Sequence, residues 1–203
     1  MKLYDAAIAP NPRRVRIYLA EKQIEVPMVA VDMGSLEHKG EAFTAKNPFQ
    51  MVPILELDDG TVITESIAIC RYFEELHPEP ALFGKGAVGK AQVEMWNRIL
   101  ELELYRHVAH AFRHGHPRMA EREVPQIAQL AEVAKTRALE TMNKLDRELQ
   151  NRPFIAGDDF SVADITGMAT LGFLKLARIE IPAELAAVQR WNDALNARPS
   201  ASA

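Results

Sequence analysis

The chain changes its pattern of apolar residues near residue 80, and this change constrains the fold more than any other feature. Residues 1 to about 77 alternate short β-branched runs with helical patterns, whereas from about residue 90 only helical spacing appears. Two prolines and three glycines lie between the two patterns, and such clusters are typical of loops. We therefore predict a mixed domain at 1–78, a linker at 79–89 and an all-helical domain at 90–203.

The first region predicts a strand, a helix and a strand, and then a hairpin and a helix. Strands at 2–8 and 26–32 with a helix at 13–22 between them predict a right-handed parallel unit. Asn11 and Pro12 suit the N-cap and the first position of that helix. A short helical piece at 41–46 precedes strands at 54–57 and 61–64, which the Asp59-Gly60 turn pairs as a hairpin before a helix at 66–76, so the predicted order is βαβ-ββα.

The second region predicts four helices whose aliphatic residues form a core. Apolar residues spaced by three and four predict long helices over 93–111 and 127–149. Ser161 and Asp164 have the spacing of a capping box, with Asp where Glu or Gln is usual, and predict the start of a third helix that runs to about Leu176. A last helix is expected over 182–198.

Composition limits the classes of function. The 203 residues are 48% apolar and 26% charged, which excludes a disordered chain, and no apolar run reaches the ~20 residues of a membrane span. A net charge of −4 gives no reason to expect nucleic-acid or lipid binding. The single cysteine, Cys70, excludes an internal disulfide and a CxxC redox pair and is expected to be an inert buried thiol. The N-terminus shows no secretion signal, so we expect a cytoplasmic protein with a small-molecule partner.

Three segments of the sequence carry a family resemblance. Met51-Val52-Pro53-Ile54-Leu55 is followed by Thr64-Glu65-Ser66-Ile67-Ala68-Ile69, and a third piece, 160–164, contains the capping box. Together they resemble the cytosolic glutathione S-transferases, in particular bacterial theta- and nu-like members. The resemblance implies a thioredoxin-like N-terminal domain, an all-helical C-terminal domain, a homodimer, and conjugation of glutathione to a hydrophobic electrophile in detoxification. Glutathione is then a co-substrate, and no other cofactor or metal is expected.

The resemblance also implies how glutathione is held. Pro53 is expected to be cis, so that the Val52 backbone pairs with the cysteinyl unit like an added strand. Glu65 would take the ammonium of the γ-glutamyl unit, and Ser66 with the helix N–H groups would hold its carboxylate. Simple capping of the helix is the alternative role for Ser66.

Two further expected contacts with glutathione rest on less specific sequence signals. His38, or its neighbour Lys39, is expected to contact the glycyl carboxylate, with a solvated polar loop as the alternative. Met51 replaces the Gln or Lys that is common before Val-Pro in the family, so the side-chain contact expected there is missing or moved to Gln50.

The residue that activates the thiol departs from the common pattern. Ala9 stands where theta- and zeta-like members have Ser, which leaves Asn11, as in nu-like members. Arg13 is a candidate for an added positive charge, with a solvated arginine as the alternative. Moving a thiol pKa from ~8.5 to ~6.5 requires about 2.7 kcal/mol, which a helix N-terminus (up to ~2) and one hydrogen bond (~1) supply. A purely structural N-cap is the alternative for Asn11.

Residues of the helical domain are assigned to the electrophile. The resemblance implies that its pocket is bordered by Tyr105, Arg106 and Phe112 and by some of the three histidines of the same helix. His107, His110 and His114 have spacing that zinc can use, but no HExxH pattern or nearby carboxylate accompanies them, so a metal site is a remote alternative. Phe49 is a candidate dimer contact that resembles the lock residue of other classes.

Two alternative functions remain open beside conjugation. An Asn-type site resembles that of members that exchange thiols with small disulfides, which makes a glutathione-dependent disulfide oxidoreductase the first alternative. The missing hydroxyl at Ala9 motivates the second, a non-catalytic glutathione-binding protein on the same fold.

Overall fold

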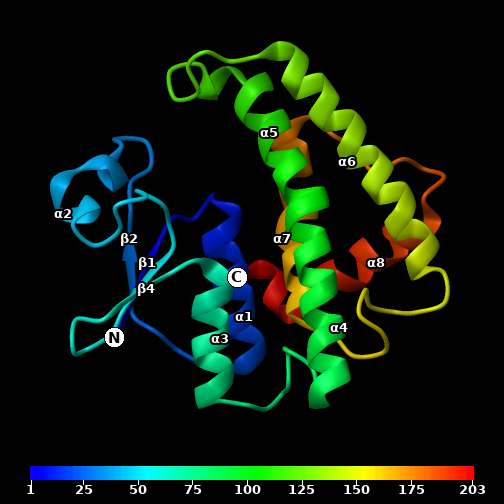
Figure 1. The fold of residues 1–203 in the computed structure, drawn as a ribbon, viewed down its shortest axis with the longest axis horizontal. Coiled ribbons are helices and arrows are strands. Elements are labelled where there is room, and N and C mark those ends of the chain that lie inside the picture. The colour runs from blue at the N-terminus through cyan, green and yellow to red at the C-terminus, as the bar shows by residue number, and fades with distance from the viewer. The chain divides into compact units, whose positions relative to one another are not determined.

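The computed structural model describes residues 1–203, which form two compact units (Figure 1). Unit 1 comprises residues 1–82 with 202–203, and unit 2 comprises residues 83–201. The first helix of unit 2 begins at Gly86, inside the predicted linker and four residues before the predicted domain start at 90. The prediction was wrong there because the glycines at 86 and 89 suggested a loop, yet both lie in the first turn of a helix.

Unit 1 is built on a four-stranded mixed sheet with the order β2-β1-β3-β4. Strands β1 and β2 are parallel, and β3 is antiparallel to both β1 and β4. The predicted βαβ-ββα order is confirmed, although every strand is shorter than expected. In chain order the elements are β1 (Lys2–Asp5), α1 (Pro10–Lys22), β2 (Met28–Ala30), a 3-10 turn (Glu37–Lys39), α2 (Glu41–Thr44), β3 (Ile54–Glu56), β4 (Val62–Thr64) and α3 (Ser66–Leu76).

The sheet register brings four chain connections to one edge of the sheet, the edge that is formed by the ends of the strands. Ile54 pairs with Tyr4 on one side and with Thr64 on the other. The chain therefore leaves β1, enters β3 and leaves β4 at the same edge, and β2, parallel to β1, also ends there. A small apolar cluster packs at this edge, formed by Ala6, Val31, Phe43, Val52 and Ile54.

Unit 2 contains only helices, as predicted. They are α4 (Gly86–Ile99), a π-helix (Leu100–Tyr105), α5 (Arg106–Gly115), α6 (Ala128–Leu149), α7 (Val162–Ala177) and α8 (Ala186–Asn196), with 3-10 turns at Pro117–Met119 and Pro199–Ser202. Helix α7 contacts α4, α5 and α8 and is buried along most of its length. Figure 1 shows α7 behind α4 and α5. No helix is both long enough and apolar enough to cross a lipid bilayer.

The predicted capping box fixes the start of α7. The Asp164 carboxylate is fully buried and accepts hydrogen bonds from the Ser161 N–H (3.0 Å), the Ser161 hydroxyl (2.9 Å), the Ile155 N–H (2.9 Å) and the Trp191 Nε1–H (2.9 Å). Asp164 therefore completes the capping box in place of the usual Glu or Gln, and its bond to Trp191 also connects α7 to α8.

Candidate functional site

Helix α1 begins earlier than the sequence suggested, which changes the role of Asn11. Ala9 is the N-cap, and Asn11 is the second residue of the helix, so the N-cap assignment of Asn11 was wrong. Proline suits the first turn because N–H groups there have no helical partner, and both Pro10 and Pro12 are accommodated in it. Since neither proline has an N–H, the backbone N–H of Asn11 is the free donor of this turn.

The Asn11 side chain presents a donor at the surface of unit 1. Its Oδ1 is buried and has no hydrogen-bond partner. Its Nδ2 is reached by solvent and makes no hydrogen bond within the chain. Ala9 offers no polar side-chain atom, and its N–H donates to the Ala6 carbonyl (3.0 Å). Asn11 is therefore the residue of this turn that can donate to a bound sulfur.

The backbone at Val52 is unpaired although its side chain is packed. The Val52–Pro53 peptide is cis, as the resemblance implies. The Val52 side chain is only 9% exposed, in the apolar cluster, while its N–H and C=O make no hydrogen bond within the chain. Gln50 donates from Nε2 to the Thr44 hydroxyl (3.1 Å), so this side chain is held within unit 1.

Helix α3 begins at Glu65 and Ser66 with an open N-terminus, in which the first backbone N–H groups have no partner in the chain. Glu65 is the N-cap, with φ 66° and ψ 118°, a left-handed φ that is rare for a residue with a side chain, and its carboxylate is exposed. Ser66 is therefore the first helical residue, and the alternative role of Ser66 as the helix cap was wrong. The first helical N–H to find a carbonyl is that of Ile69, which donates to Glu65 (3.0 Å), so the N–H groups before it are available to an anion.

Arg14 completes this corner and was missed by the sequence analysis. Its guanidinium is 1% exposed and donates from Nη1 to the Ser66 hydroxyl (2.8 Å), which links α1 to α3. The one indication in the sequence is its spacing: Arg14 lies three and four residues before Ile17 and Tyr18, which are on the buried face of α1. The residue types alone do not separate Arg14 from its neighbours Arg13 and Arg16.

His38 lies in the connection that follows β2. It is 8% exposed, within the 3-10 turn, so the solvated-loop alternative was wrong for this side chain. The turn is tied to the end of β2, because the Glu37 N–H donates to the Asp32 carbonyl (3.1 Å) and the Asp32 N–H donates to the Glu37 carboxylate (2.7 Å). The sheet topology thus brings His38 to the edge that carries Asn11, Val52 and Glu65.

The three residues assigned to the electrophile lie on one continuous stretch of helix in unit 2. Tyr105 ends the π-helix, and Arg106, which is exposed, begins α5. Phe112 lies two turns further along α5, with its ring 5.0 Å from that of Phe173 and 5.1 Å from that of His116. The structure therefore supplies an aromatic group around Phe112.

The three histidines of α5 form no metal-ligand group in the structure. No group of three His, Cys, Asp or Glu side chains in the structure is arranged to hold a metal ion. Burial, followed by nearby positive charges, lowers the pKa of His107 and His110. His114 Nδ1 accepts a hydrogen bond from the Ile127 N–H (3.3 Å) and so ties α5 to the start of α6.

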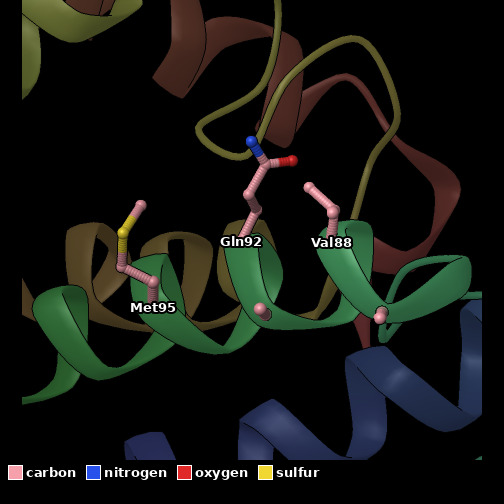
Figure 2. A pocket seen from close by; sticks show the side chains of 5 residues that line it. Val88, Gln92 and Met95 are labelled. Carbon is pink, nitrogen blue, oxygen red and sulfur yellow. The ribbon is translucent and has the colours of Figure 1, made fainter.

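Two further features lie outside this site. Cys70 is fully buried, as expected, and burial raises the pKa of its thiol. An apolar hollow runs along α4, with Val88, Gln92 and Met95 projecting from one side of the helix (Figure 2).

Comparison with known proteins identifies the family. The family model described as "Glutathione S-transferase, N-terminal domain" matches residues 8–76, and that described as "Glutathione S-transferase, C-terminal domain" matches residues 104–199. Glutathione S-transferase 2 of Saccharomyces cerevisiae is 40% identical over 98% of this chain and 87% of its own. The chain belongs to the glutathione S-transferase family.

Solved structures agree with this assignment. The crystal structure of Gtt2 from S. cerevisiae has a TM-score of 0.94 at 40% identity and covers 100% of this chain and 99% of its own. A glutathione S-transferase of class Gtt2 from Vibrio parahaemolyticus has a TM-score of 0.88 at 38% identity, covering 100% and 96%. The predicted thioredoxin-like domain and helical domain of a glutathione S-transferase are thus confirmed, while the theta- or nu-like subclass stays a prediction.

Proposed function

We propose that this transferase binds glutathione at the sheet edge of unit 1 and conjugates its sulfur to a hydrophobic electrophile. The observation that carries the proposal is the unpaired Val52 backbone, which the register of β3 and β4 places beside the open N-terminus of α3. An extended peptide with a terminal carboxylate matches this pair of features, because the first offers a strand edge and the second an anion site.

Each part of glutathione has a counterpart at this edge. The cysteinyl unit pairs with the N–H and C=O of Val52. The α-carboxylate of the γ-glutamyl unit is held by the Ser66 hydroxyl and the first N–H groups of α3, and its ammonium by the exposed Glu65 carboxylate. The glycyl carboxylate is assigned to His38, with Lys39 beside it in the same turn.

Asn11 favours the thiolate of the bound glutathione. Its Nδ2 and its backbone N–H are both free donors in the first turn of α1. Two such donors with the positive end of the helix supply the about 2.7 kcal/mol that shifts a thiol pKa from ~8.5 to ~6.5. The thiolate then attacks the electrophile and displaces its leaving group, or adds to it, and a new carbon–sulfur bond forms.

The helical unit provides the electrophile contacts. Phe112 and its ring partners offer an apolar surface, Tyr105 adds a phenol, and Arg106 adds an exposed positive charge that suits an anionic leaving group. These features favour a hydrophobic, polarised electrophile.

Disulfide exchange is the second candidate function, and one observation favours it. Ala9 provides no hydroxyl and no thiol to the sulfur, and the Asn11 amide can serve a thiolate that attacks a disulfide as well as one that attacks carbon. We also propose, from the family, that the transferase is a cytoplasmic homodimer without nucleic-acid or membrane partners and that it acts in detoxification.

Turnover assays with two substrate classes test the proposed function. Purified protein with glutathione is expected to consume an aryl halide faster than a small disulfide. A Glu65→Gln variant is expected to raise KM for glutathione about tenfold, because the negative charge that pairs with the ammonium is lost. Faster turnover of the disulfide would favour the second candidate. Calorimetric binding of glutathione without turnover of either substrate would make the protein a non-catalytic binder.

A further inference from the structure

A buried arginine controls the direction of the Ser66 hydroxyl. Arg14 is 1% exposed and donates from Nη1 to Ser66 Oγ across 2.8 Å. The two residues are 52 positions apart in sequence and lie on different helices, α1 and α3. Burying a guanidinium is costly, so its placement against this hydroxyl requires a reason.

The bond leaves the Ser66 hydroxyl with an unused hydrogen. A serine hydroxyl has one hydrogen to donate and two lone pairs that accept. Arg14 has only donors, so it occupies a lone pair and the hydrogen must point elsewhere. Ser66 is 4% exposed, yet its hydroxyl donates to no acceptor within the chain. Buried donors are almost always satisfied, which indicates an acceptor that arrives with a ligand.

We propose that Arg14 is a positioning residue that makes Ser66 a dedicated donor to the α-carboxylate of the γ-glutamyl unit. The inference rests on the proposed function, because it names how one part of that same site recognises its substrate. Arg14 acts through Ser66, because its guanidinium occupies a lone pair of the hydroxyl and so leaves the hydroxyl hydrogen for the carboxylate. The specificity concerns this carboxylate and not the thiol or the rest of the peptide.

A purely structural role for Arg14 makes a different prediction. If Arg14 only holds α1 against α3, its loss weakens the fold and lowers the affinity for every peptide bound at the edge by the same factor. A positioning role instead lowers the affinity for peptides that carry the carboxylate and leaves the affinity for a peptide without it unchanged. The ratio of the two affinities therefore separates the roles.

The test uses glutathione and 4-aminobutyryl-cysteinylglycine, which is glutathione without the α-carboxylate of its γ-glutamyl unit. Dissociation constants for both peptides are measured by calorimetry with the parent, Arg14→Met, Ser66→Ala and the double variant. We expect Arg14→Met to weaken glutathione about tenfold and the analogue less than about twofold. The double variant is expected to resemble Ser66→Ala, because the two residues act through one bond.

Two more variants serve as a matched control and as a conservative replacement of Arg14. Lys22→Met removes another buried cation of α1, one that pairs with Glu74 (2.6 Å) near the far end of the helix, and is expected to leave the ratio of the two affinities at the parent value. Arg14→Lys keeps a hydrogen-bond donor for the Ser66 hydroxyl and is expected to restore part of the preference for glutathione. It also provides the measurement if Arg14→Met does not fold.

Three outcomes would each contradict either the positioning role of Arg14 or the proposed function. Equal weakening of both peptides by Arg14→Met, or by Arg14→Lys where only that variant folds, would overturn the positioning role and leave the proposed function intact. Full additivity of Arg14→Met and Ser66→Ala for glutathione would also overturn it. A parent protein that binds neither peptide would instead overturn the proposed function itself.

Discussion

At the residue scale, the site is marked by polar groups whose hydrogen bonding is incomplete. Asn11 Oδ1 is buried without a partner, the Val52 backbone is unpaired, and the Ser66 hydroxyl keeps an unused hydrogen. Folded chains rarely leave such groups unsatisfied, so their gathering at one sheet edge indicates a ligand that completes them. Sequence motifs predicted these residue types, but the state of each bond became visible only in the folded unit.

The burial of Arg14 could not be predicted from its residue type. It stands among three arginines within four positions, and only helix packing decides that this one is buried. The spacing of apolar residues on α1 carried a weak signal, but arginine is normally read as a surface residue.

Gly167 in α7 allows a sharp stability prediction. A Cβ at this position would lie 2.3 Å from Cη2 of the buried Trp191 ring, so Gly167→Ala forces the ring or the helix to move. We expect the free energy of unfolding to fall by about 1–3 kcal/mol, measured from urea unfolding midpoints. Gly89→Ala in α4 is the matched control, because a Cβ there meets only ordinary contacts, and helix propensity predicts a gain of up to about 1 kcal/mol. A Gly167→Ala protein as stable as the parent would contradict this packing.

At the scale of elements, periodicity predicted which elements exist but not where they begin. The helix α1 starts at Pro10 because two prolines fit a first turn that needs no N–H donors, whereas Asn11 before Pro12 suggested a cap. One long helix was expected over 93–111, but the chain forms α4, a π-helix and α5 there. Leu100, Leu104 and Val108 are spaced by four, as in an α-helix, so the pattern of apolar residues gives no sign of the π-helix.

Glu56 links the elements of unit 1 at the surface of β3. Its carboxylate accepts hydrogen bonds from Lys46 Nζ (2.7 Å) and from the Tyr4 hydroxyl (2.7 Å) on β1. These bonds, with a smaller contribution from Lys2, lower the pKa of Glu56 from 4.5 to about 2. A lowered acid pKa favours the folded state above pH 4.5, and this contribution is lost as the pH falls toward 2.

The pH dependence of stability tests this network. We expect Glu56→Gln to be less stable than the parent by a constant amount at neutral pH, and the difference to shrink between pH 4.5 and 2. Urea unfolding of both proteins across this range measures it. A difference that stays constant down to the lowest pH would show that the ionised carboxylate is not what stabilises this part of the sheet.

At the scale of the whole molecule, the division into two kinds of domain was the most predictable property. It depends on a change of periodicity that spans many residues, so errors at single positions do not affect it. The predicted parallel crossover and hairpin are both present, whereas the antiparallel pairing of β1 with β3, which completes the sheet, was not predicted. Substrate identity did not follow, because it depends on side chains such as Phe112 whose neighbours are set by packing in three dimensions.

The proposed homodimer predicts a role for Phe49. This ring is 81% exposed in the single chain, which is unusual for so large an apolar group and consistent with a contact to a second copy. We expect light scattering to give twice the mass of 22.7 kDa for the parent, and Phe49→Ser to raise the dimer dissociation constant at least about tenfold. A parent that stays monomeric at micromolar concentrations would contradict the dimer, and an unchanged constant in Phe49→Ser would remove Phe49 from the contact.

We have proposed that Asn11 stabilises the thiolate of glutathione bound at this edge, and an ultraviolet titration of the bound thiol measures this effect. With the parent saturated in glutathione, thiolate absorbance is expected to appear with an apparent pKa about two units below the ~8.5 of a free thiol. Asn11→Ala is expected to raise that pKa by about one unit, and Asn11→Asp by more, because a carboxylate repels the thiolate. The same bound-thiol pKa in all three proteins would contradict the account.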